Sequence, residues 1–162
     1  VDAMAWFTDT VLQLVQAQIP DTKLYIVGQK PHPRLETLRH KHNIEITGWV
    51  ADVQPFLRGA GVYVAPLRMG SGTRLKILEA MAAGCAVVAT SIAISGMREE
   101  ADKAMVVVDD VETMAQEIIT LLQMPEQRTL LGKRAQRFVK QYYDWPVLIP
   151  NLLKIYQELR IG

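Results

Sequence analysis

The feature that most constrains this chain is an alternation of short apolar runs with amphipathic stretches. The apolar runs lie at residues 23–28, 61–66, 86–90 and 105–108, a further short strand is expected at residues 44–48, and segments with a helical period separate most of them. Short strands that are apolar on both faces and alternate with helices are typical of a parallel sheet covered by helices. The sequence therefore predicts an α/β protein with a Rossmann-like, doubly wound parallel sheet and with helices at its C-terminal end.

Length and composition predict one domain over residues 1–162. Hydrophobic residues make up 49% of the chain, which suits a globular protein with a packed core. The net charge of +1 gives no electrostatic reason to expect a nucleic acid partner. The one cysteine, Cys85, excludes an internal disulfide and suits a reducing compartment, and no run approaches the ~20 apolar residues of a membrane span. We therefore expect a cytoplasmic protein.

The order of the first elements is unusual for a doubly wound sheet. A helical pattern over residues 2–18, which Asp2 could cap, comes before the first apolar run. In such a sheet the first strand is central and precedes the first helix. We therefore expect the sheet to lack its first central strand, and the chain to be a piece of a longer protein. The position of the lacking strand in the sheet could stay open, pair with a neighbouring molecule or be filled by rearrangement.

Residues 61–84 predict an anion-binding turn. The apolar run is followed by a glycine-bearing loop over residues 69–72, then by a helical pattern from Thr73 to Ala83 that Gly84 closes. The free amides and the dipole at the start of a helix favour an anion, and glycines allow close approach of the backbone. The local pattern alone also fits a tight turn that binds nothing.

The expected helix carries three polar residues on one face. Thr73, Lys76 and Glu79 are spaced i, i+3, and Glu79 lies about 9 Å along the helix axis from Thr73. A phosphate near residues 71–73 and a hydroxyl-bearing group at Glu79 would then be spaced like the diphosphate and ribose of a nucleotide. A solvated glutamate, or one paired with a nearby cation, is the alternative. The residues expected to pack on the sheet are Leu75, Leu78 and Ala82.

Ligands of open parallel sheets bind outside the carboxyl ends of the strands. The strand exits of this sequence are rich in glycine and small residues. The candidate lining is Gly28, residues 48–50, residues 66–72 and the small-residue loop at 90–96.

Residues 66–90, PLRMGSGTRLKILEAMAAGCAVVAT, are similar to the donor-site signature of family 4, GT-B type glycosyltransferases, the glycosyl transferases of group 1. The likeness continues upstream of the signature, at residues 46–53 and 60–66. Further upstream, residues 24–28 resemble the first strand of the family's domain that is visible in this chain. Asp144-Trp145 resembles the start of the closing helix of that family. The likeness extends from Asp2 to about Tyr156.

The resemblance implies the nucleotide-sugar-binding, C-terminal half of a two-domain hexosyltransferase of polysaccharide biosynthesis. Such an enzyme transfers a sugar from a nucleotide-diphosphate sugar to an acceptor, with retention of configuration. The final helix, at about residues 144–160, would cross to the absent N-terminal acceptor domain, and the whole enzyme could associate peripherally with a membrane. No cofactor or metal is implied, because the stretch has no paired carboxylates of the metal-binding kind.

The resemblance also implies roles for single residues. Glu79 matches the second glutamate of the family's Glu-x7-Glu motif, which binds ribose hydroxyls, and Ser71 stands where the first glutamate is expected. Val50 matches the nucleobase wall. The basic pair that binds the diphosphate in that family usually follows the missing strand, and the nearby cations that could replace it are Arg68, Arg74 and Lys76. The full set expected to bind the donor is Gly28, Val50, Arg68, Gly70, Ser71, Gly72, Thr73, Leu75, Lys76 and Glu79.

No catalytic residue is predicted within the chain, whose role would be electrostatic. Two other functions fit the same residues. One is a nucleotide- or phosphate-binding module without transferase chemistry. The other is a nucleotide-sugar epimerase of the same GT-B architecture.

Overall fold

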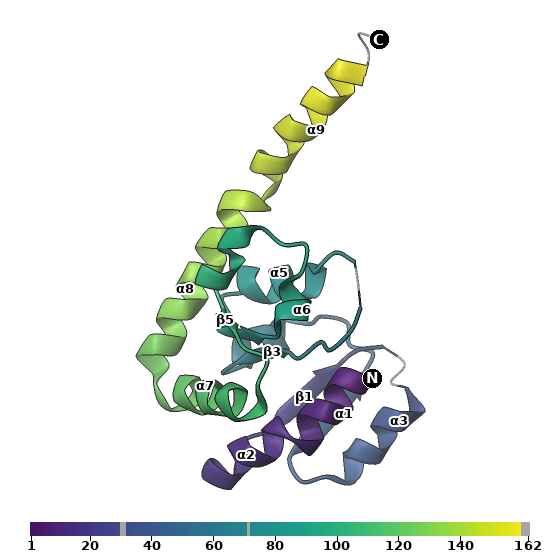
Figure 1. Ribbon diagram of the computed structural model, residues 1–162. Helices are drawn as coiled ribbons and strands as arrows, with labels where there is room; N and C mark the ends of the chain where they lie inside the picture. The colour runs from purple at the N-terminus through teal and green to yellow at the C-terminus, as the bar shows by residue number, and fades with distance from the viewer. Residues whose placement is uncertain (30–31, 71, 160–162) are drawn as a thin grey trace.

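The computed structural model describes residues 1–29, 32–70 and 72–159. Strands and helices alternate along the chain, which confirms the predicted α/β class (Figure 1). The order is α1 (Asp2–Asp9), α2 (Val11–Gln18), β1 (Leu24–Val27), α3 (Pro33–Glu36), the 3-10 helix η1 (Thr37–His40), β2 (Ile44–Gly48), α4 (Gln54–Gly59), β3 (Tyr63–Ala65), α5 (Leu75–Ala82), β4 (Val87–Ala89), α6 (Ser91–Ile94), the 3-10 helix η2 (Glu99–Lys103), β5 (Val106–Val107), α7 (Val111–Gln123), α8 (Pro125–Tyr142) and α9 (Trp145–Leu159).

All described strand pairs are parallel, and they form two sheets. One sheet has the order β1-β2, and the other has the order β3-β4-β5. A doubly wound sheet has the strand order 3-2-1-4-5-6. Removal of strand 1 leaves a two-stranded group, 3-2, and a three-stranded group, 4-5-6, which match β1-β2 and β3-β4-β5. The division between β1 and β3 therefore falls where the sequence predicts the first central strand to be lacking.

One hydrophobic core spans both sheets. Phe7, Val11 and Val15 of α1 and α2 are fully buried, and their cluster includes Leu24 of β1 and Val64 of β3. Side chains from α7 complete this layer: Met114, Ala115, Ile118, Ile119 and Leu121. The two sheets are thus held as parts of one layer by the helices on this face.

The first helical segment differs from its prediction in two ways. It is broken into α1 and α2 at Thr10, whose φ and ψ are −123° and −79° and whose hydroxyl donates to the Trp6 carbonyl (2.7 Å). The predicted cap by Asp2 is wrong, because Asp2 is the first residue of α1 and Val1 holds the cap position without a side-chain bond. The Asp2 carboxylate instead lies 3.6 Å from the Arg68 guanidinium.

Helices α5 and α8 cover the opposite face. Met81, Ala135 and Phe138 pack with the β4 side chains in a second core. Gly132 of α8 meets the turn after α5 so closely that a Cβ there would lie 2.1 Å from the Gly84 carbonyl oxygen. Only glycine permits this approach of the two helices.

Strand β1 was predicted to be buried on both faces, and this is wrong for one face. Tyr25 is 46% exposed, and its ring lies beside Phe56 of α4, 5.9 Å between centroids. Leu24, Ile26 and Val27 are half-buried, so the apolar run packs less deeply than β4, which is fully buried.

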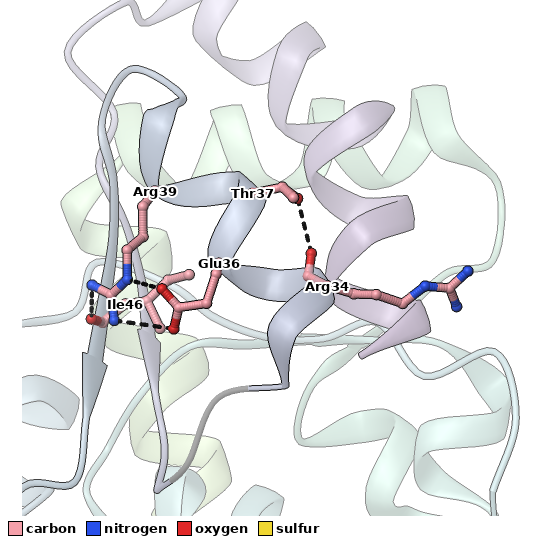
Figure 2. A network of polar contacts seen from close by, with 5 residues as sticks. All are labelled: Arg34, Glu36, Thr37, Arg39 and Ile46. Atoms are coloured by element: carbon pink, nitrogen blue, oxygen red, sulfur yellow. Dashed lines mark hydrogen bonds and ion pairs between the residues drawn. The ribbon is translucent and has the colours of Figure 1, made fainter.

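The short helices between β1 and β2 are fastened to β2 by one arginine. Arg39 donates to the Ile46 carbonyl oxygen (2.8 Å) and forms an ion pair with Glu36, as Figure 2 shows. The Thr37 hydroxyl closes the same turn by donating to the Arg34 carbonyl oxygen (2.9 Å). This network lies on the β1-β2 side of the molecule.

Helix α9 projects from the rest of the molecule beyond α8 (Figure 1). Its charged residues Lys154 and Glu158 form an i, i+4 pair (3.9 Å). Large apolar side chains lie exposed along the helix: Trp145, Leu148, Ile149, Leu152, Leu153, Ile155, Tyr156 and Leu159. No helix within the described ranges is both long and apolar enough to span a bilayer.

Candidate functional site

The carboxyl ends of β3, β4 and β5 lead into connections that are tied to one another. The Thr90 hydroxyl, which is buried, donates to the Leu67 carbonyl oxygen and accepts from the Ala93 amide (3.3 Å). The Asp109 carboxylate, just after β5, accepts from the Ser91 amide (2.8 Å). Three neighbouring strand exits are therefore held together by side-chain bonds to the backbone.

Residues 91–94 form the short helix α6, where the sequence predicted a loop of small residues. The N-cap Thr90 is the reason, because its hydroxyl accepts from an amide of the first turn. Sequence reasoning missed Thr90 as a structural residue of this edge. A threonine directly before a run able to form a helix is the signal that identifies it.

The glycine loop after β3 adopts a backbone conformation that residues other than glycine rarely adopt. Gly70 has φ +121° and Gly72 has φ +108°, and a Cβ at either residue would meet no atom within 4 Å. Both glycines therefore border open space. Ser71, between them, lies outside the described residues.

Helix α5 begins at Leu75, so the predicted start at Thr73 is wrong. Arg74 occupies the cap position, and its carbonyl oxygen accepts from the amides of Ile77 and Leu78, both at 3.0 Å. Within the described residues, the amides of Leu75 and Lys76 have no acceptor. Thr73 belongs to the loop, so its distance from Glu79 is not set by the helical rise.

The predicted packing face of α5 is wrong for Leu75 and Ala82, whereas Leu78 does pack against the core. Ile77, Ala80 and Met81 are buried, whereas Leu75 is 66% exposed. Ala82 is exposed and Leu78 is half-buried. Ile77, Ala80 and Met81 follow the i, i+3, i+4 spacing of one helix face. This face is buried in the core that α5 shares with β4 and α8.

Lys76 and Glu79 both lie on the exposed side of α5. Across the described ranges, neither has an ion-pair partner. Burial, then the charges of Cys85 and Glu79, raise the pKa of Tyr63 to about 12. Glu79 itself is exposed, so its carboxylate is open to solvent.

The two arginines near the loop have partners in the protein. Arg68 lies over the Trp6 ring, 5.6 Å from its centroid, and pairs with Asp2. One terminal nitrogen of Arg74 donates to the carbonyl oxygens of Ile92 (2.8 Å) and Gly70 (3.4 Å). Among the three cations expected near the diphosphate, Lys76 is the one whose charge has no partner in the described part of the chain.

The remaining predicted residues lie at other exits. Gly28 directly follows β1 and borders open space, and Val50 is half-buried after Gly48, whose φ is +71°. Two open hollows of the surface lie elsewhere and include none of the predicted donor residues. One is lined by α8 residues from Pro125 to Lys133, and the other by residues 18–23 with Leu122 and Gln123. No group of three potential metal ligands occurs among the residues that the structure describes.

A protein-family model described as glycosyl transferases group 1 matches residues 1–124. A phosphatidyl-myo-inositol mannosyltransferase of Mycolicibacterium smegmatis is 31% identical over an alignment of 149 positions, which covers 88% of this chain and 38% of that protein. An uncharacterised 44.6 kDa protein from the cps region of Klebsiella pneumoniae is 24% identical over 95% of this chain and 42% of its own length. The chain thus spans about two fifths of the length of the curated relatives it matches.

Solved structures share the fold. The glycosyltransferase WaaG has a TM-score of 0.67 at 19% identity, over 82% of this chain and 38% of that one. TarM has a TM-score of 0.72 at 20% identity, over 90% of this chain and 31% of that one. The C-terminal domain of LpcC from Francisella tularensis has a TM-score of 0.66 at 20% identity, over 82% of this chain and 75% of that one. These neighbours have the GT-B architecture, which confirms the fold predicted from the sequence.

Proposed function

This chain belongs to the glycosyl transferases group 1 family, and from that premise we propose that it is the donor-binding part of a retaining hexosyltransferase. The proposed reaction transfers a sugar from a nucleotide-diphosphate sugar to an acceptor. The observation that carries the proposal is the β3 exit, where a loop with two glycines at positive φ leads into the N-terminus of α5. This arrangement supports binding of a phosphate group.

The chemistry at this exit suits a diphosphate. The amides of Leu75 and Lys76 are free of acceptors in the described part of the chain, and the exposed Lys76 side chain adds a positive charge nearby. Such donors stabilise negative charge that develops on a leaving group during transfer. In this proposal the loop and the first turn of α5 hold the diphosphate while its bond to the sugar breaks.

Glu79 is proposed to accept hydrogen bonds from the ribose. An ionised carboxylate is an acceptor only, and a ribose diol offers two donors. Glu79 lies four residues into α5, about 6 Å along the axis from Leu75, on the same exposed side as Lys76. Val50 and Gly28, at the exits of β2 and β1, are proposed to face the base and the rest of the donor.

The relatives support the class of substrate. The related Mycolicibacterium protein is a mannosyltransferase by name, and a mutant of S. aureus TarM has been solved in complex with UDP and sugar ligands. From these relatives we propose that the donor of this chain is also a nucleotide sugar and that the transferred sugar is a hexose. A role in polysaccharide biosynthesis in the cytoplasm, with peripheral contact of the whole enzyme to a membrane, is part of the same proposal.

We propose that α9 packs on an N-terminal acceptor domain in a longer protein. The support is its row of exposed apolar side chains, together with the fact that the chain covers about two fifths of its relatives. An apolar helix surface of this extent is normally covered. The acceptor and the remaining catalytic groups then come from the other domain.

Calorimetric titration with UDP, GDP and ADP tests the donor site, first on the unaltered chain and then on Glu79→Ala. We expect one of the nucleotides to bind, and Glu79→Ala to weaken it about tenfold because a charge-assisted hydrogen bond is lost. Glu126→Ala is the matched control, because Glu126 is an exposed glutamate on α8 beside a separate hollow. The ribose assignment is wrong if no nucleotide binds, or if the two variants behave alike.

A further inference from the structure

The Arg74 side chain spans two strand exits. It starts at the cap of α5 and ends at the carbonyl oxygen of Ile92 in α6, at 2.8 Å, with a longer contact of 3.4 Å to the Gly70 carbonyl oxygen. Its terminal nitrogen therefore joins the glycine loop after β3 to the helix after β4. For the described residues of that loop, this is the only side-chain hydrogen bond from elsewhere in the chain.

The loop needs such a contact more than an ordinary turn does. Its two glycines have few conformational restrictions of their own, so fixing the loop costs more backbone entropy than fixing other residues. Thr90 fastens only the first part of the connection, through the Leu67 carbonyl oxygen. The position of Gly70 relative to α5 is then left to Arg74.

Arg74 makes this contact at a cost. Its Nε is buried and has no hydrogen-bond partner among the described residues. A buried donor without an acceptor loses free energy of hydration, so a purely stabilising side chain at this position would be expected to satisfy it. The arrangement therefore favours a functional reason for the arginine.

We propose that Arg74 is a positioning residue for the donor diphosphate. It acts on the phosphate through the glycine loop, whose geometry it fixes against α6, and its guanidinium does not serve as the charge partner of the phosphate. This inference rests on the donor site proposed above and adds the residue that orders that site. The sequence alone had grouped Arg74 with the local cations for the diphosphate.

Arg39 provides a matched control. It too donates to a backbone carbonyl across two elements, from η1 to Ile46 of β2 (Figure 2). It belongs to the β1-β2 side and has no bond to the glycine loop. Loss of either arginine removes a comparable contact, but only Arg74 borders the proposed diphosphate.

The test compares the unaltered chain with Arg74→Met, Arg74→Lys and Arg39→Met. The ligands are the nucleoside diphosphate that the unaltered chain binds and its parent nucleoside, measured by ligand-observed NMR. We expect Arg74→Met to weaken the diphosphate about tenfold and to leave the nucleoside unchanged, while Arg39→Met changes neither. We expect no rescue by Arg74→Lys, because lysine keeps the charge but its side chain is one atom shorter.

Rescue by Arg74→Lys would overturn the inference in favour of a direct charge contact. Equal weakening of nucleoside and diphosphate, or none, would overturn it as well. If the unaltered chain binds no nucleotide, the donor assignment fails first. Amide hydrogen exchange of the free chain then decides the positioning role: Arg74→Met should speed exchange at residues 91–95 and Arg39→Met should not, and unchanged exchange overturns it.

Discussion

Asp110 shows how one carboxylate fixes the start of a long helix. Its two oxygens accept from the amides of Glu112 and Thr113, both at 3.1 Å, at the N-terminus of α7. The hydrogen bonds from Thr113 and Glu112 lower the pKa of the Asp110 carboxyl. The folded state therefore favours the ionised form, so the contribution of Asp110 to stability is fully present above the ordinary aspartate pKa, declines below it, and is lost as the pH falls through the lowered pKa of the folded state.

We expect Asp110→Ala to lower the Tm clearly at pH 7 and much less at about pH 3, below the ordinary aspartate pKa of about 3.9. Thermal unfolding at the two pH values measures this. Asp21→Ala serves as the control, because Asp21 is exposed and its carboxylate accepts no hydrogen bond within the described residues. A deficit for Asp110→Ala that is as large at low pH as at neutral pH would contradict the account.

Single residues were predicted best where the signal is local. Asp110 directly precedes a run with a helical period, which is a local signal for a helix start. The hydrogen bond that Asp109 accepts from the Ser91 amide instead depends on a strand exit distant in sequence. The buried face of α5 was misassigned at Leu75, because Leu75 is as apolar as Ile77. Only the placement of α8 decides which of them is covered. Partners such as those of Arg74 are likewise set by tertiary structure.

At the scale of elements, the approach of α8 to the end of α5 depends on one glycine. A Cβ on Gly132 would lie 2.1 Å from a backbone oxygen of Gly84, which no side-chain movement can relieve. We expect Gly132→Ala to destabilise the chain by about 1–3 kcal/mol or more, as overpacking of a core does. Urea unfolding followed by circular dichroism measures the change.

Gly59→Ala is the matched control for that substitution. Gly59 is also helical, at the end of α4, and a Cβ there would meet nothing within 4 Å. The free energy of unfolding of the Gly59→Ala variant should not fall. The added methyl group meets no other atom, and alanine favours helix more than glycine does. Comparable losses for the two variants would show that the close contact between α5 and α8 is not what requires glycine.

The elements themselves were largely predictable. Short, mostly apolar runs predicted the positions of the strands, although β2 also contains Glu45 and Thr47. Asp110 and Pro125 are ordinary local signals for the starts of α7 and α8. The break at Thr10 was not visible, because the apolar period continues through it and the threonine hydroxyl bonds back to the Trp6 carbonyl. The exposure of Tyr25 depends on what covers β1, which the run of apolar residues does not encode.

At the scale of the whole molecule, two features stand out, the division of the sheet and the exposed surface of α9. The sheets divide between β1 and β3. Helix α9 projects from the rest of the molecule (Figure 1), and its large apolar side chains are exposed. The parallel α/β class followed from the alternation in the sequence, and the place of the division followed from the order of the elements. The amount of apolar surface that α9 exposes was not predictable from the sequence, because it depends on the direction in which the helix leaves α8.

We expect the isolated 162 residues to show no transferase turnover with any nucleotide-sugar donor. The reason is that the proposed acceptor site and further catalytic groups belong to the domain against which α9 is proposed to pack. A coupled assay of nucleoside diphosphate release, with UDP-, GDP- and ADP-sugars, measures this. Turnover by these residues alone would show that the chain carries a complete active site.

The most direct test of the donor site is amide hydrogen exchange with and without saturating nucleoside diphosphate. The account predicts slower exchange at residues 67–79, with smaller effects at 48–50 and 90–94, and no change along α7. Protection centred on the hollow of α8 from Pro125 to Lys133, with residues 67–79 unchanged, would contradict it.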